Sequence, residues 1–358
     1  MKFLFIIQGE GRGHATQAMA LYEILNKHNH DVCAAMLGTS RLRQRNSFIE
    51  NSIKCPVLTF KSPNFLKKKN KKGILVFRSI VYNFFYTFQY IASIRKINKT
   101  VKTSKPDVIV NFYDMIGGLY AFFYNPKIRV YCISHQYYFN HPDFVPPKGF
   151  FLQKKLLALH SRITSLRATK ILALSYTDGT DIPKKRLYLC PPLIRNEILT
   201  ANNHKNGFVL GYILNEGFSQ DIIKWHEQHP ATKLHVFWDK AGIPEETVIN
   251  NNLVFHKINN EKFVRYLEKC SSYFSTAGFE SICEAMFLGK PVLVNPSERH
   301  YEQNCNAVDA VNTGAAITNN QFNLSSLIEF SENYRKDHYF EKWVKQAESV
   351  FLYHLGPE

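Results

Sequence analysis

Three glycines and a histidine stand together directly after the first apolar run of the chain. Gly9, Gly11 and Gly13 alternate with other residues, Arg12 lies between the last two, and His14 follows. In a Rossmann-like unit, such a turn joins a strand to a helix and lets phosphate approach the helix N-terminus. A histidine there lies at the ligand-binding edge of the sheet, and its near-neutral pKa suits a general base. The turn is therefore a candidate site for phosphate binding and proton transfer. The simpler alternative is a tight turn with a surface histidine.

The same turn departs from the glycine pattern of dinucleotide-binding enzymes. The pattern G-x-G-x-x-G places its third glycine where this chain has His14, because Gly13 comes one residue early. The acidic residue expected at the end of the second strand is also missing, since Asp31 stands at the start of that strand. A hydride-transfer enzyme is therefore disfavoured.

Composition sets the broad class of the protein. The length of 358 residues favours two domains, and the apolar share of 45% is enough for sizeable cores. The seven cysteines form no C-x-x-C pair and are odd in number, which indicates a reduced, cytoplasmic chain. The first apolar run, residues 2–7, is too short for an export signal and is expected to form a strand.

Charge is divided unevenly between the two halves. Up to Arg195 there are 31 basic and 9 acidic residues, a balance of +22. The remainder has 14 basic and 20 acidic residues, a balance of −6. This asymmetry suggests two domains with different partners, and the basic half should favour an anionic surface or ligand.

Short apolar runs alternate with helical patterns along the whole chain, which predicts a doubly wound, largely parallel sheet in each of two domains. We expect an N-terminal Rossmann-like domain over residues 1–200, a second over 207–332 and a terminal helical piece over 333–358, with a polar linker between the first two. The expected strands are 2–7, 31–37, 56–60, 107–112, 129–134, 170–175, 208–213, 233–238, 253–258, 272–278 and 291–296.

A second motif runs from Ser275 to Ala316. It fits the pattern G-x-x-S/T-x-x-E-A, then G-x-P, a proline, an acid–Gln pair and N-A. The matching residues are Gly278, Ser281, Glu284, Ala285, Gly289, Pro291, Pro296, Glu302, Gln303, Asn306 and Ala307. This stretch resembles the donor-nucleotide signature of GT-B glycosyltransferases. The nearest branch looks like the one that holds MurG and the UDP-glycosyltransferases, with a C-terminal signature similar to glycosyltransferase family 28.

The resemblance implies a GT-B fold: two Rossmann-like domains facing a cleft, with the C-terminal helix returning to the first domain. It implies transfer of a sugar from a nucleoside-diphosphate sugar, with UDP favoured, to a hydroxyl acceptor. No D-x-D stands at a strand end and no His/Asp/Cys set has metal-ligand spacing, so neither a metal nor another cofactor is expected.

The resemblance also assigns roles within the donor motif. The helix expected within residues 276–288 can hold a diphosphate with its N-terminal backbone amides, and Ser281 adds a hydroxyl donor. Glu284 would accept both ribose hydroxyls, although S-x-x-E also fits a capping box. Glu302 and Gln303 would bind sugar hydroxyls, or simply suit a helix N-terminus.

One position departs from the family pattern. Many UDP-glycosyltransferases place a histidine against the phosphates where this chain has Thr276, which brings a hydroxyl but no charge.

The resemblance further implies an inverting displacement with His14 as the base. Asp114, after the fourth strand, would orient His14 as an Asp–His pair. Its equally weighted alternative is an N-cap for the helix that follows. Arg12 and Arg195 are candidates to meet the charge of the leaving group, and are otherwise surface residues.

His135 and Gln136 follow the fifth strand and are expected to face the cleft between the domains. They could contact the acceptor or the donor. A half-buried loop cluster is an equally weighted alternative.

Residues 64–105 bear on the acceptor. A lysine-rich stretch precedes an apolar and aromatic run over 74–94, and basic residues follow. Arg78, Asn83 and Gln89 interrupt the run, which favours an amphipathic helix over a membrane span. A lipid-linked acceptor at the inner membrane face would account for the basic stretch. The alternative is a core helix with solvated lysines.

Two other classes remain open. A nucleotide-sugar 2-epimerase shares the two-domain layout and the donor, but needs several acidic and basic groups around the sugar. A nucleic-acid-binding protein is suggested by charge alone; the chain lacks a recognisable binding module, and its acidic second half argues against it.

Overall fold

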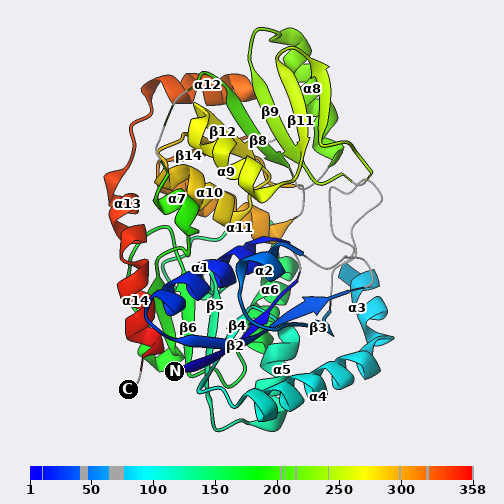
Figure 1. Cartoon of the computed structure of the whole chain (residues 1–358). Helices are drawn as coiled ribbons and strands as arrows, with labels where there is room; N and C mark the ends of the chain where they lie inside the picture. The colour runs from blue at the N-terminus through cyan, green and yellow to red at the C-terminus, as the bar shows by residue number, and fades with distance from the viewer. Residues whose placement is uncertain are drawn as a thin grey trace.

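The computed structural model describes residues 1–9, 11–40, 47–63, 76–201, 204, 206–213, 216–240, 242–297, 300–319 and 322–356. Within them the chain forms two α/β domains, each built around a seven-stranded sheet (Figure 1).

The N-terminal sheet is parallel throughout and has the strand order β3-β2-β1-β4-β5-β6-β7. Its strands are β1 (Lys2–Ile7), β2 (Asp31–Thr39), β3 (Val57–Lys61), β4 (Val108–Phe112), β5 (Arg129–Ser134), β6 (Lys170–Leu174) and β7 (Leu187–Cys190). The accompanying α-helices are α1 (Gly13–Lys27), α2 (Ser47–Ser52), α3 (Val76–Phe84), α4 (Thr87–Ser104), α5 (Met115–Tyr124), α6 (Phe151–Thr164) and α7 (Asn196–Leu199).

The central strand β1 shows why this sheet is covered on both faces. All residues from Phe3 to Ile7 are fully buried. Successive side chains of a strand point to opposite faces, so Phe3, Phe5 and Ile7 join one apolar cluster while Leu4 and Ile6 join another. The apolar run therefore places the end of β1, and the glycine turn after it, at the centre of the sheet's carboxyl edge.

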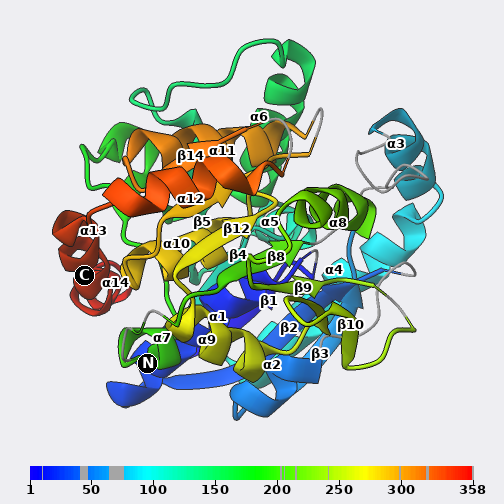
Figure 2. The ribbon, with the colours of Figure 1, turned by 90° about the horizontal axis from the view of Figure 1, so that it is seen from above.

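The second sheet has the order β10-β11-β9-β8-β12-β13-β14, and only the pairing of β10 with β11 is antiparallel. Its strands are β8 (Val209–Ile213), β9 (Leu234–Trp238), β10 (Glu246–Asn250), β11 (Leu253–Lys257), β12 (Ser272–Ser275), β13 (Val292–Val294) and β14 (Ala316–Thr318). Its helices are α8 (Ser219–Gln228), α9 (Asn260–Lys269), α10 (Phe279–Phe287), α11 (Tyr301–Asn312) and α12 (Leu324–Asn333). Figure 2 shows these elements from above.

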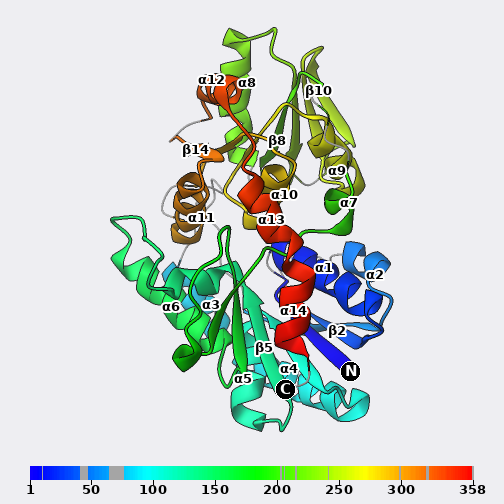
Figure 3. The ribbon, with the colours of Figure 1, turned by 90° about the vertical axis from the view of Figure 1, so that its left-hand side faces the viewer.

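The last two helices, α13 (His338–Lys345) and α14 (Ala347–Leu355), cross from the second domain back onto the first (Figure 3). The Trp343 indole donates a hydrogen bond to the Ser175 carbonyl at 3.0 Å, and Lys27 pairs with Glu348 at 2.7 Å. The predicted pair of Rossmann-like domains and the returning C-terminal helix are thus confirmed.

Three strands were not expected from the sequence. β14 has three residues and β7 four, too few to show a period, and β10 is an antiparallel edge strand with mostly exposed side chains. The domain limits at 200, 207 and 333 stay a prediction; β7 ends at Cys190 and β8 begins at Val209.

The lysine-rich stretch of the predicted acceptor region, residues 64–73, and the first two residues of the apolar run, 74–75, lie outside the described residues. The rest of that region forms α3 and α4. In the described part of the chain, no helix is both long and apolar enough to cross a membrane.

Candidate active site at the domain interface

The glycine turn brings the first helix of one domain against α10 of the other. Gly11 has a φ of +80°, which a side chain would strain, and a Cβ at Gly13 would collide with the Glu280 carboxylate. Arg12, the N-cap residue of α1, donates a hydrogen bond to the Asn260 side chain at 3.1 Å. The turn predicted at Gly11, Arg12 and Gly13 is therefore part of the contact between the two domains.

His14 is the second residue of α1 and is buried, not a surface residue. Its ring stacks on Tyr113, with ring centroids 5.7 Å apart, and its Nδ1 lies 3.3 Å from Gln17 Oε1. Burial lowers the pKa of His14 to about 4, so the imidazole is neutral at pH 7. A neutral imidazole can accept a proton.

Gln17 joins this histidine to the other domain. One turn further along α1, its Nε2 donates to Glu280 Oε1 on α10. Because that bond fixes the amide orientation, Gln17 Oε1 is an acceptor and His14 Nδ1 carries the hydrogen. The lone pair of His14 is thereby left on Nε2. Burial raises the pKa of Glu280 to about 7, with the charges of Glu284 and Glu302 adding to the shift.

The expected pair of Asp114 with His14 is wrong. Asp114 caps α5: its Oδ1 accepts from the backbone N–H groups of Ile116 and Gly117 at 2.8 and 3.2 Å. Its Oδ2 accepts from the Ser62 hydroxyl at 2.7 Å. Both oxygens are therefore used within the N-terminal domain, and the helix-cap alternative is correct. Burial raises the pKa of Asp114 to about 6.

Glu284 and Arg195 form a buried bidentate ion pair. The Nε and Nη2 atoms of Arg195 lie 2.6 and 2.8 Å from the two carboxylate oxygens, and Glu284 is 1% exposed. Ser281 bonds instead to the Gly278 carbonyl, at 3.4 Å, so the capping-box alternative is wrong. Arg195 is not a surface residue either. Both Glu284 oxygens therefore already accept a hydrogen bond from Arg195, and each keeps a second lone pair.

The N-terminus of α10 lies at the domain interface, where Phe279 stacks on His135. Gly278 is the N-cap residue of α10, the preceding Ala277 has a φ of +58°, and Thr276 is buried after β12. Asn306 on α11 donates to the Ala277 carbonyl at 2.8 Å. The side chain of a second signature residue therefore holds this turn in place.

Gln136 and Glu302 meet across the interface. The Gln136 amide donates to Glu302 Oε1 at 2.8 Å and its own Oε1 accepts from Ser134. Burial raises the pKa of Glu302. Gln303 instead accepts from the backbone N–H of Ser297 at 2.8 Å. One predicted donor residue thus contacts a predicted cleft residue, while the other stabilises the loop before α11.

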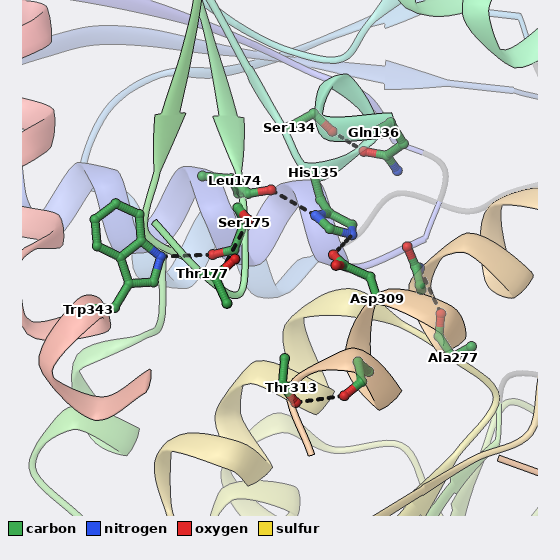
Figure 4. A network of polar contacts seen from close by, with 12 residues as sticks. Ser134, His135, Gln136, Leu174, Ser175, Thr177, Ala277, Asp309, Thr313 and Trp343 are labelled. Carbon is green, nitrogen blue, oxygen red and sulfur yellow. Dashed lines mark hydrogen bonds and ion pairs between the residues drawn. The ribbon is translucent and has the colours of Figure 1, made fainter. Parts of the chain in front are cut away.

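A second imidazole, His135, also lies at this interface. Its Nδ1 is 2.7 Å from the Leu174 carbonyl, and its ring stacks on Phe279 of α10 with centroids 3.8 Å apart. Its Nε2 lies 3.5 Å from Asp309 Oδ2 (Figure 4). Burial lowers the pKa of His135 to about 3 and raises that of Asp309 to about 7.

A pocket opens at the carboxyl ends of β2 and β3 in the N-terminal domain. Lys61, Ser62 and the tyrosines Tyr82, Tyr86 and Tyr90 line it. Ser62 also bonds to Asp114, the neighbour of the Tyr113 ring on which His14 stacks. Ser62 thus connects this pocket of the N-terminal domain to His14 through Asp114 and Tyr113.

Three functional candidates were not found from the sequence. Gln17 stands three residues after His14 on the same helix face, a spacing that could have suggested the pair. Glu280 and Asp309 carry no such signal, because their partners lie 263 and 174 residues away. No cluster of three or more His, Cys, Asp or Glu side chains suited to a metal ion was found among the described residues.

Comparisons with known proteins agree with this architecture. A relative from Methanosarcina acetivorans described as "Uncharacterized glycosyltransferase" is 26% identical, over 94% of this chain and 90% of its own. The solved glycotransferase of kitacinnamycin has a TM-score of 0.63 at 13% identity, covering 97% of this chain and 95% of that one. The UDP-GlcNAc 2-epimerase from Neisseria meningitidis has a TM-score of 0.53 at 19% identity, covering 99% of both chains.

These structural similarities show the fold alone. The family itself is shown by a sequence match that spans almost the whole chain, from residue 1 to residue 334. The family is described as "Glycosyl transferase family 1". The narrower resemblance to the MurG branch is not tested by this match and stays a prediction. The chain belongs to glycosyl transferase family 1.

Proposed function

We propose that this protein transfers a sugar from a nucleoside-diphosphate sugar, with UDP favoured, to a hydroxyl acceptor, inverting the anomeric centre. The observation that carries the proposal is His14, a buried neutral imidazole at the carboxyl edge of β1, facing α10 of the second domain through Gln17 and Glu280. Neutrality at pH 7 and a lone pair on Nε2 are what a general base requires.

The reaction is one displacement. His14 Nε2 takes the proton of the acceptor hydroxyl while the acceptor oxygen forms a bond to the anomeric carbon. The bond from that carbon to the phosphate oxygen breaks, and the nucleoside diphosphate leaves with the electron pair. Gln17 keeps the hydrogen on Nδ1 throughout, in the place where an aspartate was expected.

The leaving diphosphate would be held by the N-terminus of α10. The backbone N–H groups after Gly278, the Ser281 hydroxyl and the helix dipole supply positive potential there, with the Thr276 hydroxyl beside them. Glu280 lies at this end of α10 with a pKa of about 7. In its neutral form it would donate a hydrogen bond to phosphate. The proposal needs no metal ion or other cofactor.

The ribose would be bound by Glu284 after partial release from Arg195. The freed guanidinium would then add positive charge near the phosphates. Glu302 and Gln303 would bind sugar hydroxyls, with Gln136 moving from Glu302 as the donor enters.

Calorimetric titration of UDP, GDP and TDP tests the donor site. Glu284→Ala alone leaves Arg195 buried without its partner, which costs about 3–5 kcal/mol of folding stability. The matched set is therefore Glu284→Gln, Arg195→Gln and the double variant, each checked for folding. We expect one nucleotide to bind the wild type and to bind Glu284→Gln at least tenfold more weakly, about one lost charged hydrogen bond. No binding of any of them would contradict the proposal.

A nucleotide-sugar 2-epimerase remains the second candidate, because the interface gathers the acids that such chemistry needs. Glu280, Glu302 and Asp309 are all buried there with raised pKa values. Analysis of the sugar product separates the two reactions: an epimerase yields a sugar inverted at carbon 2 without an acceptor, whereas a transferase yields the sugar linked to the acceptor.

A further inference from the structure

Two helices of the N-terminal domain present phenylalanines directly to solvent. Phe84 and Phe85 are 75% exposed and Phe88 is 86% exposed, at the turn between α3 and α4. Val81 and Ile91 flank them and are 43% and 41% exposed. A contiguous apolar tip of this kind is rare on a protein that meets only water, and it marks an interaction surface.

The helix that follows carries positive charge on the same stripe. Phe88, Ile91, Arg95, Lys99 and Lys102 recur every three or four residues, so they share one face of α4. The three cationic residues are exposed. No acidic residue occurs in the chain between Glu50 and Asp107, so no nearby carboxylate in the sequence neutralises them. The stripe therefore passes from aromatic to basic along the helix.

The opposite side of the same turn faces the pocket at the ends of β2 and β3. Tyr82, Tyr86 and Tyr90, spaced four residues apart, line the pocket beside Ser62 at the end of β3. Phenylalanines thus face outward and tyrosines face the pocket. Figures 1 and 2 place α3 and the start of α4 on the side of the molecule opposite α13 and α14.

We infer that the tip of α3 and α4 docks on an anionic lipid bilayer. Phe84, Phe85 and Phe88 enter the interface between headgroups and acyl chains, and Arg95, Lys99 and Lys102 lie against the negative headgroups. A bilayer with negative headgroups fits both features, because it offers an apolar layer to the exposed rings and negative charge to the basic stripe. On the proposed function, an acceptor carried by the bilayer would then reach the tyrosine-lined pocket from the membrane side.

Co-sedimentation of the full chain with vesicles tests the docking. Vesicles of phosphatidylcholine alone are compared with vesicles of phosphatidylcholine and phosphatidylglycerol in equal parts. We expect binding to the anionic vesicles only. The triple variant Phe84→Ser, Phe85→Ser, Phe88→Ser should bind at least about tenfold more weakly, because its apolar anchor is lost. The variant Arg95→Gln, Lys99→Gln, Lys102→Gln should lose on the order of a hundredfold in affinity.

Tyr353 supplies the matched control. It is 80% exposed on α14, away from the tip, so Tyr353→Ser should leave vesicle binding unchanged. Absence of binding to either vesicle, equal binding to both, or wild-type binding by the triple phenylalanine variant would overturn the inference. Preferential binding of a nucleic acid that displaces the vesicles would overturn it as well. Nucleotide titration into the triple variant keeps the two proposals apart: nucleotide binding without vesicle binding overturns only the docking.

Discussion

Two buried imidazoles face α10 across the domain interface, and their surroundings differ in one decisive way. His14 reaches a carboxyl group of the second domain only through the neutral amide of Gln17. His135 faces the carboxyl of Asp309 directly at 3.5 Å and stacks on Phe279. Burial lowers both histidine pKa values, and of the two only His14 directly follows the glycine turn.

These different neighbours leave only one of the two histidines available for chemistry. The Nε2 of His135 is aimed at Asp309, so that centre can hold the domains together but offers little to a substrate (Figure 4). In the His14 centre, Nδ1 is fixed and Nε2 keeps its lone pair. An uncharged positioning residue also leaves the imidazole pKa low, whereas a carboxylate would raise it.

Replacing each histidine in turn should give the largest effects, on turnover for His14 and on folding stability for His135. His14→Ala should lower the rate of nucleoside-diphosphate release by about 10²–10⁴-fold, the usual contribution of a general base. His135→Ala should instead lower the free energy of unfolding by about 2–4 kcal/mol, because it removes a packed ring and its hydrogen bond. Single-turnover assays and urea denaturation measure the two effects. A loss of turnover confined to the His135 variant would reverse the assignment.

Gln17→Leu should break the positioning of His14 without removing the base. Loss of the fixed tautomer should lower turnover by about tenfold, the cost of about one hydrogen bond. The nucleotide affinity of Gln17→Leu should equal that of the wild type. In Gln17→Glu, the carboxylate should raise the pKa of His14 and move the acid limb of the pH–rate profile upward. An unmoved acid limb would show that Gln17 only fills space.

The pH dependence of donor binding should identify Glu280. Its pKa is raised to about 7 by burial, so it is neutral below that pH and ionised above it. An ionised carboxyl would repel the diphosphate, so affinity should fall by about tenfold as pH rises from 6 to 8. Glu280→Gln should remove the fall. Nucleotide titrations at pH 6 and pH 8 measure this change in affinity. If the change persists in Glu280→Gln, another group causes it.

Asp309→Asn should give the smallest effect, a change in thermal stability that reports on the surroundings of His135. Unfolded Asp ionises near pH 4, whereas burial raises the folded pKa of Asp309 to about 7. Ionisation of Asp309 therefore lowers the free energy of unfolding of the protein as pH rises from about 4 to about 7. The variant should melt a few degrees higher than wild type at pH 8, and with little difference at pH 4. A lower melting temperature at pH 8 would instead show that His135 and Asp309 form an ion pair.

The sequence predicted those features that depend on hydrophobic periodicity and on short local motifs. Apolar runs such as 2–7 and 208–213 located the central strands, and the glycine turn and the motif after Ser275 located both sides of the interface. Partners were harder. The sequence left Asp114 equally open to His14 and to a helix cap, and in the fold two backbone N–H groups of its own helix bind the carboxylate.

Contacts between distant residues left no trace in the sequence. Arg195 and Glu284 lie 89 residues apart, and only the folded interface shows that they neutralise each other. Gln17 and Glu280 stand in positions that the motif leaves unspecified. Their pairing depends on the angle between two domains, which no local pattern encodes.

The proposed mechanism requires His14 to be neutral at pH 7 with its hydrogen on Nδ1. The most direct measurement is a pH titration by nitrogen-15 NMR of histidine-labelled protein, with His14→Ala to assign the signal. We predict the Nδ1–H tautomer at pH 7, protonation only near pH 4, and loss of the tautomer preference in Gln17→Leu. A His14 that is charged at pH 7, or that carries its hydrogen on Nε2, would contradict the account.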